Sequence, residues 1–327
     1  MSQVKMVIDT DGGIDDAVAI LWAATRPVID LLAITVVHGN VECSIAAENV
    51  CRVLELAGRN DVPVFLGETS PFPEAPRLRP ADFVHGVDGL GNTHRAKASQ
   101  SPREGDGVRE LIDVVKSNTG EISLVTVGPL TNIARAVRRD ASFAGAVKEL
   151  VVMGGAVTVP GNALPAAEAN IAHDPQAAQI VVAAPWVAPP LLVGLDITHR
   201  ATLTESMLRE IESSTNPFSC FLAAPLRFYQ HAGGTFCDVE GDLPCHDLLA
   251  TMAAVLPVVR GERLPLAVQT EKGPALGATI ADLRQPYFVR RGGGSIQGHE
   301  IPFYDWRIGL DVDVEMFRSE IRRLFGI

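Results

Sequence analysis

The chain is poor in cysteine and shows no regular cysteine spacing. Its 327 residues include five cysteines, at Cys43, Cys51, Cys220, Cys237 and Cys245. An odd number without a CxxC pair predicts neither a disulfide framework nor a cysteine zinc site. Cys43 and Cys51 fall in a stretch with helical spacing, where we expect them to be core residues. This sparse use of cysteine suits a reducing cytosol.

Long apolar runs and basic clusters are also missing. Without an uninterrupted apolar stretch of about 18 residues, no membrane-spanning helix is expected. The first residues lead directly into a strand-like run without the pattern of a secretory signal, so a cytoplasmic location is the expectation. Lys and Arg number 28 against 39 Asp and Glu, which gives a net charge of −11. Nucleic acid and anionic membranes are therefore not expected as partners, whereas a sugar bound through a cation fits this balance.

Strand-like and helix-like runs alternate through the first two-thirds of the chain. This alternation predicts an α/β fold with a mostly parallel central sheet and helices on both faces. Polar clusters follow the strands, and open sheets of this class bind ligands at those strand ends. The expected strands are residues 4–9, 31–37, 62–65, 122–127, 150–153 and 191–195, and the expected helices are 15–25, 42–57, 107–117, 131–139 and 175–184.

The last third of the chain has a different pattern, which predicts C-terminal helical and short-strand additions. Because the sequence shows no internal repeat and no low-complexity linker, we expect residues 1–327 to form a single domain. Residues 71–102, rich in proline and glycine, form a stretch too long for an idle loop, so we expect it to cover a site. The expected late elements are helices at 204–213, 217–231, 246–256 and 313–325, and short strands within 264–312, including Arg290-Arg291 and Gly292 to Gly294.

Residues 7–16 carry the most informative motif, four carboxylates around a glycine pair. Asp9 and Asp11 end an apolar strand, and Asp15 and Asp16 begin a helix-like run. Four acids this close repel one another unless a positive charge lies among them, and a hard divalent cation is the simplest answer. Alternatively, Asp15 and Asp16 only cap the helix. Capping would explain these two acids but not the two at the strand end.

Three further segments carry candidate site residues. Asn162, Glu168 and Asn170 follow a strand end in an otherwise apolar stretch. They would hydrogen-bond a polyhydroxylated ligand, or they belong to a surface loop with turn-forming asparagines. His246 and Asp247 begin a helix-like run, as a proton donor and a metal ligand or as simple caps. His85 lies in a glycine-rich segment of the long loop, where an ordinary surface histidine is an equal alternative.

Together these segments closely resemble the inosine-uridine-preferring nucleoside hydrolases (nucleoside N-ribohydrolases), over nearly the whole chain. The resemblance implies the fold of that family, with its Rossmann-like core, and hydrolysis of the N-glycosidic bond of ribonucleosides to ribose and a free base. It also implies a homodimer or homotetramer. The matching motifs are VIDTDGGIDDAVAI, AITVVHGN, HGVDGLG, LVTVGPLTNIA, VVMGGAV, GNALPAAEANIAHDP, VGLDIT and the His246-Asp247 pair.

Carried over residue by residue, the resemblance implies a Ca²⁺ site and two catalytic groups. Asp11, Asp16 and Asp247 would bind Ca²⁺ through their side chains, and Val127 through its backbone carbonyl. Asp11 would also be the general base that activates the metal-bound water. His246 would protonate the leaving base or stabilise its departure. An oxocarbenium-like ribosyl centre, as in glycoside hydrolysis, would be stabilised by the nearby carboxylates.

The resemblance also implies a ribose pocket. Asp15, Asn40 and Asn170 would bind the 2′- and 3′-hydroxyls, so ribosides should be favoured over 2′-deoxyribosides. Asn162, Glu168 and Met153 would reach the 5′-hydroxyl, and His85 would lie at the edge of the pocket.

The chain departs from the family pattern in three places. Gly12 replaces the usual proline, so the metal loop is less preset in the unfolded chain. Ala169 stands where many members have an aromatic, which leaves base preference open. In residues 217–246, several aromatics could face the base or fill the core: Phe218, Phe221, Phe228, Tyr229 and Phe236.

Two alternative functions remain at the level of sequence. A haloacid-dehalogenase-type phosphatase also opens with Asp-x-Asp after its first strand, but it needs a later lysine and a further acidic pair at strand ends. Lys148 precedes its strand, and no matching acidic pair follows. A non-catalytic Ca²⁺-dependent nucleoside- or ribose-binding protein is the other alternative. The presence of all the expected acids and His246 favours the hydrolase.

Overall fold

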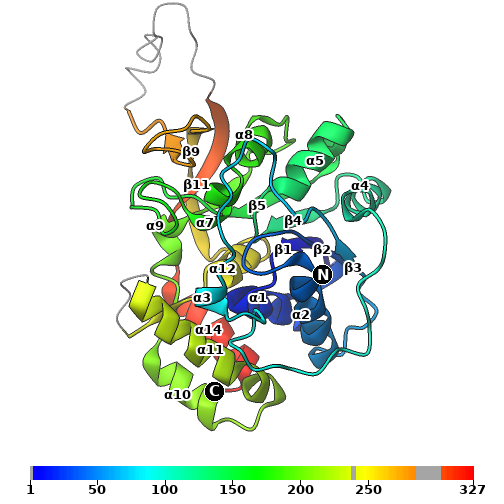
Figure 1. The fold of residues 1–327 in the computed structure, drawn as a ribbon, viewed down its shortest axis with the longest axis vertical. Helices are drawn as coiled ribbons and strands as arrows, with labels where there is room; N and C mark the ends of the chain where they lie inside the picture. Colours follow the sequence, from blue (N-terminus) through cyan, green and yellow to red (C-terminus); the bar gives the residue numbers. More distant parts are fainter. Residues whose placement is uncertain (1–2, 237–240, 285–302) are drawn as a thin grey trace, which may run out of the picture.

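The computed structural model describes residues 3–236, 241–284 and 303–327, and its centre is a nine-stranded sheet (Figure 1). The strand order is β10-β9-β11-β6-β5-β4-β1-β2-β3. All neighbours from β11 to β3 pair in parallel, whereas β9 pairs antiparallel with both β11 and β10. The predicted α/β fold with a mostly parallel sheet is confirmed. The strands are β1 Val4–Thr10, β2 Ile29–Val36, β3 Val64–Leu66, β4 Ser123–Thr126, β5 Glu149–Met153, β6 Leu191–Val193, β9 Val259–Val268, β10 Thr279–Ala281 and β11 Tyr304–Val312.

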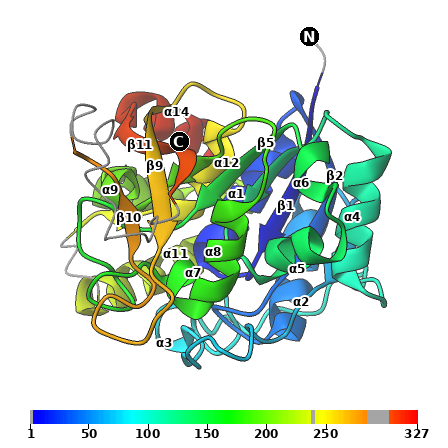
Figure 2. The same ribbon diagram turned by 90° about the horizontal axis from the view of Figure 1, so that it is seen from above.

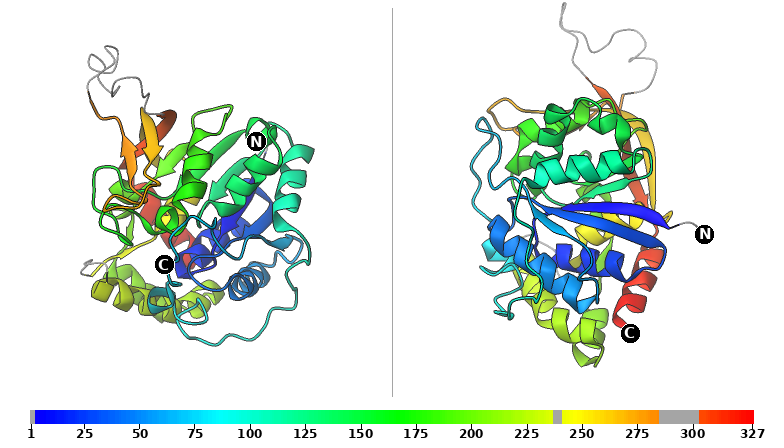
Figure 3. Two further views of the ribbon diagram at one scale, coloured as in Figure 1. Left: turned by 45° about the horizontal axis from the view of Figure 1, so that its top comes forward. Right: turned by 90° about the vertical axis from the view of Figure 1, so that its right-hand side faces the viewer.

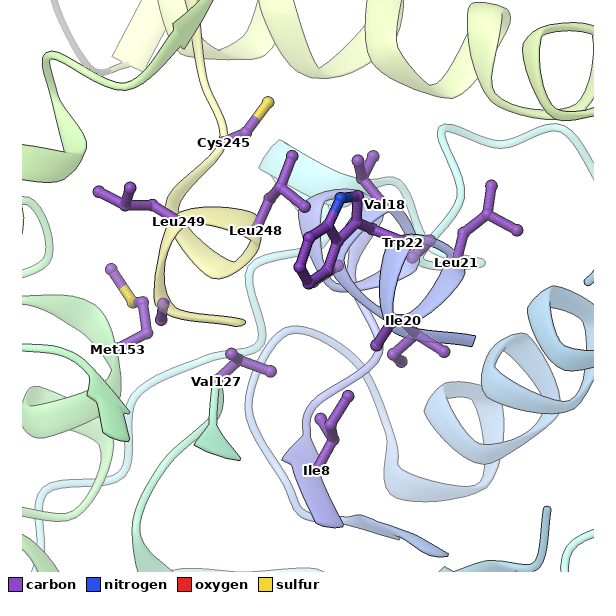
Figure 4. Close-up of a cluster of buried hydrophobic side chains, with 14 of the residues drawn as sticks. Ile8, Val18, Ile20, Leu21, Trp22, Val127, Met153, Cys245, Leu248 and Leu249 are labelled. Atoms are coloured by element: carbon purple, nitrogen blue, oxygen red, sulfur yellow. The ribbon is translucent and has the colours of Figure 1, made fainter. Parts of the chain in front are cut away.

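Two hydrophobic clusters lie on opposite faces of this sheet. In β1, Met6 and Ile8 belong to one cluster and Val7 to the other, because successive side chains of a strand point to opposite faces. Figure 4 shows part of the first cluster, in which Ile8 lies near side chains of two helices that include Trp22 and Leu248. Burial on both faces explains why these strands are nearly continuous apolar runs in the sequence.

Helices cover both faces, as Figures 2 and 3 show. Side chains from one set of helices join the cluster that contains Ile8, and side chains from a second set join the cluster that contains Val7. The first set is α1 Ile14–Thr25, α2 Cys43–Leu56, α10 Glu205–Ser213, α11 Pro217–Phe236, α12 His246–Ala253 and α14 Val314–Phe325. The second is α4 Gly107–Ser117, α5 Thr131–Arg139, α6 Phe143–Ala146 and α8 Pro175–Ala183. Cys43 and Cys51 of α2 are buried, as expected.

The sequence pattern did not reveal the shortest elements. They are α3 Asp82–His85, α6, α7 Ala169–His173, α9 Leu195–Thr198, and the β7 Thr202–Leu203 and β8 Leu243–Pro244 pair. One helical turn or a two-residue strand is too short to show a period.

The expected C-terminal helices and strands are present, but β9 and β11 are longer than the short strands that the sequence predicted. Strands β9 and β11 pair with each other and extend the main sheet through β6. Residues Arg290-Arg291 and Gly292 to Gly294 lie outside the described residues. In the part of the chain that the structure describes, no helix is long and apolar enough to cross a membrane. The single domain stays a prediction.

Candidate active site

The C-terminal ends of β1, β2, β4 and β5 meet at one edge of the sheet, where the parallel pairing places them side by side. The loop between β1 and α1, residues 10–16, is called the aspartate loop below. Its shape is set by Asp16. The Oδ2 of Asp16 accepts from the Gly13 N–H at 2.8 Å, and its Oδ1 accepts from the Thr10 hydroxyl and from the Asp11 N–H at 3.3 Å. Asp16 therefore does cap α1, as the capping alternative expected, but it is also buried with other acids.

Gly12 has a backbone conformation that a proline cannot adopt. Its φ is +68°, and a Cβ at this position would lie 2.6 Å from the Cα of Ala46 in α2. Proline fixes φ near −65°, so the loop follows a different path from the one that a proline would impose. The glycine at this position is therefore required by the left-handed turn and by the close approach of α2.

Asn40, which follows β2, holds the carboxylate of Asp11. Its backbone N–H donates to Oδ2 of Asp11 at 2.9 Å, and its side-chain Nδ2 donates to Oδ1 at 2.9 Å. The same Nδ2 lies 3.2 Å from Oδ2 of Asp16. Asn40 thus links two of the acids, and its position at a strand end is what brings it to them.

A buried group of carboxylates could hold a metal ion. Asp15, Asp16 and Asp247 each offer an oxygen, and these oxygens lie within 4.8 Å of one another. Asp247 comes from the first turn of α12, far along the chain. Among the described residues, no lysine or arginine forms a salt bridge with any of the three. Three buried oxygen donors without a positive partner fit a hard divalent cation.

The raised pKa values of Asp15, Asp11 and Asp247 also fit a cation among the carboxylates. Burial, followed by repulsion from the neighbouring carboxylates, raises the pKa of Asp15 to about 8. The pKa values of Asp11 and Asp247 are raised well above their usual range by the same two causes. A cation among the carboxylates would favour their charged forms, because an opposite charge nearby lowers a carboxylate pKa. Asp11 is not one of these three closely spaced acids. It lies beside them, because the Nδ2 of Asn40 donates to both Asp11 and Asp16.

The segment that contains Glu168 and Asn170 folds against the strand ends rather than lying free on the surface. Asn170 donates from Nδ2 to the carbonyl oxygens of Val127 and Met153, both at 3.2 Å. Glu168 caps α7 and also accepts from the Gly155 N–H at 3.0 Å. Its burial raises the pKa of the carboxyl to about 7. These polar groups are therefore fixed in place before any ligand binds.

Asn162 supports the same turn. Its Oδ1 accepts from the backbone N–H of Ala169 at 2.9 Å. Ala169 faces the pocket with a methyl group only, so this position offers no aromatic surface to a base.

Two histidines lie beside the acids in the same pocket. His246 makes a 2.7 Å hydrogen bond through Nδ1 to the hydroxyl of Thr198. The Nδ1 of His85 accepts from the Ile14 N–H of α1 at 3.1 Å. Burial lowers the pKa of His246 to about 3 and that of His85 to about 4, so both rings are neutral at pH 7. His85 must be neutral to accept that hydrogen bond.

Tyr229 of α11 completes this side of the site. Its ring lies against His85, with centroids 5.1 Å apart, and its hydroxyl lies 3.4 Å from Oδ2 of Asp15. The other described aromatics of this stretch, Phe218, Phe221 and Phe228, pack against the core. The sequence showed an aromatic-rich segment here, but only the fold reveals which ring faces the site. The side chain of Phe236 lies outside the described residues.

These groups surround a cavity of about 340 Å³. Every site residue predicted from the sequence lines it except Asp11 and Asp16, which contact it through Asn40. Residues 78–85 of the long loop also line it, as expected of a loop that covers a site. We call Asp11, Asp15, Asp16, Asn40, Glu168, Asn170 and Asp247 the polar floor, and Leu78, Arg79, Ala81, Phe83, Val84, His85, Tyr229 and His246 the wall.

Comparison with known proteins agrees with this arrangement. A family model described as inosine-uridine preferring nucleoside hydrolase matches residues 6–319. A probable uridine nucleosidase 2 from Arabidopsis thaliana is 40% identical over 253 residues, which are 77% of this chain and 78% of that protein. The inosine-uridine preferring nucleoside hydrolase of Leishmania major is 37% identical over 286 residues, 86% of this chain and 88% of that protein.

A solved structure of a plant nucleoside hydrolase matches with a TM-score of 0.89 and 35% sequence identity, and the match covers 99% of both chains. The family model spans nearly the whole chain, and the relatives cover more than two thirds of it. The resemblance seen in the sequence is thereby confirmed, and the chain belongs to the inosine-uridine preferring nucleoside hydrolase family.

Proposed function

We propose that this nucleoside hydrolase cleaves the N-glycosidic bond of ribonucleosides with the help of Ca²⁺ bound at the polar floor. The proposal rests on one observation: Asp15 and Asp247 belong to a buried group of three acids that forms no salt bridge among the described residues, and both line a cavity together with amides and Glu168. Asp11, Asp16 and Asp247 would hold the ion, together with the carbonyl of Val127. Oxygen donors of this kind suit Ca²⁺, which accepts six to eight of them.

The chain's own groups would carry the chemistry. When bound, Ca²⁺ would supply positive charge that makes a nearby water more acidic and orients the ribose hydroxyls. Asp11 would take the proton from the attacking water. Its two oxygens are held by Asn40, and burial makes the carboxylate more basic, which suits a general base. The remaining acids would stabilise positive charge on the ribosyl ring.

The ribose would be bound by groups that already have fixed orientations. Asp15, Asn40 and Asn170 would bind the 2′- and 3′-hydroxyls. Asn170 uses its Nδ2 on two backbone carbonyls, so its Oδ1 is the atom left for a ligand. Asn162, Glu168 and Met153 would surround the 5′-hydroxyl. Loss of the 2′-hydroxyl would leave buried polar groups unpaired, which can cost on the order of 10⁴-fold in kcat/KM.

The wall would contact the base. His246 would donate a proton to the departing base, with Thr198 holding the ring at Nδ1 so that Nε2 is the donor. Negative charge that develops on the base would favour the protonated imidazole and raise its pKa in that state. His85 and Tyr229 would lie beside the base. The relatives named above are a uridine nucleosidase and an inosine-uridine hydrolase, so uridine and inosine are the first substrates to test.

A substrate panel tests this function. We expect ribose release from uridine or inosine, at least about 10³-fold slower release from the matching 2′-deoxyribonucleosides, and loss of release after chelation that Ca²⁺ restores. Adenosine and cytidine complete the panel and define the base preference. If Ca²⁺ binds but no ribonucleoside is cleaved, the alternative of a non-catalytic binding protein replaces the proposal. Family membership leaves no basis for the phosphatase alternative.

The assembly and location remain proposals as well. A homodimer or homotetramer is what the family resemblance implies, and cytoplasmic location is what the cysteine content favours. Sedimentation of the purified chain would decide the first.

A further inference from the structure

Two segments that are distant in the sequence meet beside the cavity, the aspartate loop and residues 85–94. A hydrogen bond joins them directly: the Ile14 N–H donates to Nδ1 of His85. His85 is 5% exposed and lines the cavity. The ring of His85 also lies against Tyr229, and Leu90 is buried in the core, so any polar bridge between the two segments adds to these contacts.

Asn49 of α2 supplies a second attachment. Its Nδ2 donates to the carbonyl oxygen of Gly12 at 3.2 Å and to that of Asp88 at 2.8 Å. Its Oδ1 accepts from Nη1 of Arg52 at 2.7 Å. The amide orientation is unambiguous, because turning it over would place its oxygen against two carbonyls and its NH₂ against a guanidinium. The side chain is 2% exposed, so water does not replace these partners.

The backbone on both sides leaves room for this bridge. Gly12, at φ +68°, directs its carbonyl to α2. Gly89, at φ +71°, has no Cβ; if it had one, that atom would lie 2.6 Å from Nδ2 of Asn49 and 3.1 Å from the carbonyl oxygen of Gly12. A larger residue at Gly89 would displace the amide of Asn49, whereas a larger residue at Gly12 would clash with Ala46 of α2.

The segment held by Asn49 is itself stiff. The carboxylate of Asp88 accepts from the backbone N–H groups of Leu90, Asn92 and His94 at 2.8 to 2.9 Å. Burial acts against its charged form, but these hydrogen bonds prevail and lower the pKa of Asp88. Because the turn is rigid, fixing the carbonyl of Asp88 also fixes His85 three residues earlier.

We infer that Asn49 is a positioning residue, which attaches residues 85–94 to the aspartate loop and so holds His85 in the wall of the cavity. Asn49 does not line the cavity. Its contribution to turnover rests on the proposed function, but its contribution to the structure of residues 85–94 does not.

Hydrogen exchange tests the structural part. In Asn49→Ala, the backbone amides of residues 85–94 should exchange about tenfold faster or more, since two buried hydrogen bonds are lost. Asn49→Asp keeps the size of the side chain but lacks the N–H donors, so it should behave like Asn49→Ala. The control is Val53→Ala, which removes a core side chain from the same helix (1% exposed) and should leave residues 85–94 as protected as in the wild type. Unchanged protection in Asn49→Asp, or equal loss in Val53→Ala, overturns the inference.

A double-mutant cycle tests the functional part. With uridine or inosine, Asn49→Ala should lower kcat/KM by about 10- to 100-fold. The variant with both Asn49→Ala and His85→Ala should be no worse, within about threefold, than His85→Ala alone, because residues that act through one another are not additive. If the loss of kcat/KM in the double variant equals the product of the losses in the two single variants, the inference is overturned. If the wild type cleaves no ribonucleoside, the proposed function fails, and hydrogen exchange still decides the role of Asn49.

Discussion

The polar floor and the wall of the cavity are built in different ways. The floor groups come from strand ends, the first turn of α1, α7 and the first turn of α12, and they hydrogen-bond to one another or to nearby backbone. Most wall groups come from the long loop, and Tyr229 comes from α11; His85 is held by the Ile14 N–H and lies against the ring of Tyr229, whose hydroxyl is 3.4 Å from Oδ2 of Asp15. The position of the floor therefore follows from the topology of the sheet, whereas the wall depends on particular tertiary contacts.

Burial has opposite effects on the two regions. It raises the pKa values of Asp11, Asp15, Glu168 and Asp247, with that of Asp15 at about 8, and it lowers those of His85 and His246 to about 4 and 3. Burial disfavours whichever form is charged, so acids and histidines shift in opposite directions. A cation would therefore favour the ionised forms of these four acids, whereas His85 and His246 are neutral at pH 7 without one. This contrast supports the proposal that the metal and the base catalyst belong to the floor and the leaving group to the wall.

The largest expected effect comes from the floor. Asp11→Ala should lower kcat by about 10³-fold or more, because it removes a general base and a proposed metal ligand together. The control Asp140→Ala removes a surface acid that pairs with Lys116 and should leave turnover unchanged. Steady-state kinetics on uridine or inosine measures both. An Asp11→Ala enzyme as active as the wild type would end the assignment of the floor as the catalytic region.

A wall residue should have a smaller and more selective effect. His246→Ala should lower kcat/KM on a common ribonucleoside by about 10²- to 10⁴-fold, but much less on an activated aryl riboside, whose leaving group needs no proton. Thr198→Val should give a milder form of the same pattern, because it removes the partner of Nδ1. Equal losses on both substrates would argue against the acid role and would remove the distinction between floor and wall.

Three buried acids, Asp15 and Glu168 of the floor and Asp9 of β1, predict how stability depends on pH in the absence of metal. The folded pKa of Asp15 is about 8, and those of Asp9 and Glu168 are about 7. All three are raised above their unfolded values, so their contribution is complete below about pH 4 and is lost as the pH rises through 7 to 8. Between pH 7 and 9, where His85 and His246 are already neutral, the free energy of unfolding should fall by about 1–3 kcal/mol.

Urea denaturation with chelator present measures this change. Added Ca²⁺ should raise the stability more at pH 9 than at pH 7, because protons compete with the metal for the same carboxylates. A chain that becomes more stable between pH 7 and 9 without metal would contradict the raised pKa values.

The smallest expected effect is at Tyr229. Tyr229→Phe removes one hydroxyl, 3.4 Å from Asp15, and keeps the ring beside His85. The long hydrogen bond suggests a loss in kcat/KM of about threefold to tenfold, with a change in the ratio between uridine and inosine. Parallel kinetics on the two substrates would show it. A loss as large as that of Asp11→Ala would mean that the wall, too, carries the central chemistry.

This difference between the regions also decided what could be predicted from sequence. The acids of the aspartate loop, Asn40 and Val127 all follow strands, and the rule that ligands gather at strand ends placed them together in advance. His246 and Asp247 could be singled out at the start of a helix-like run, but the sequence alone left simple capping as an equal alternative, and the family resemblance favoured the functional roles. Tyr229 could not be distinguished from its aromatic neighbours, because the face that α11 presents depends on how the helix packs. Gly12 was unexplained until its positive φ and the nearness of Ala46 were known.

A Ca²⁺ titration of the chelator-treated protein tests the central claim most directly. Bound calcium and ribose release from uridine or inosine should be measured on the same samples. Both should rise together and saturate at one ion per chain, and Asp247→Ala should weaken both by about tenfold or more. Full ribose release without bound calcium, or calcium binding that Asp247→Ala leaves unchanged, would contradict the account.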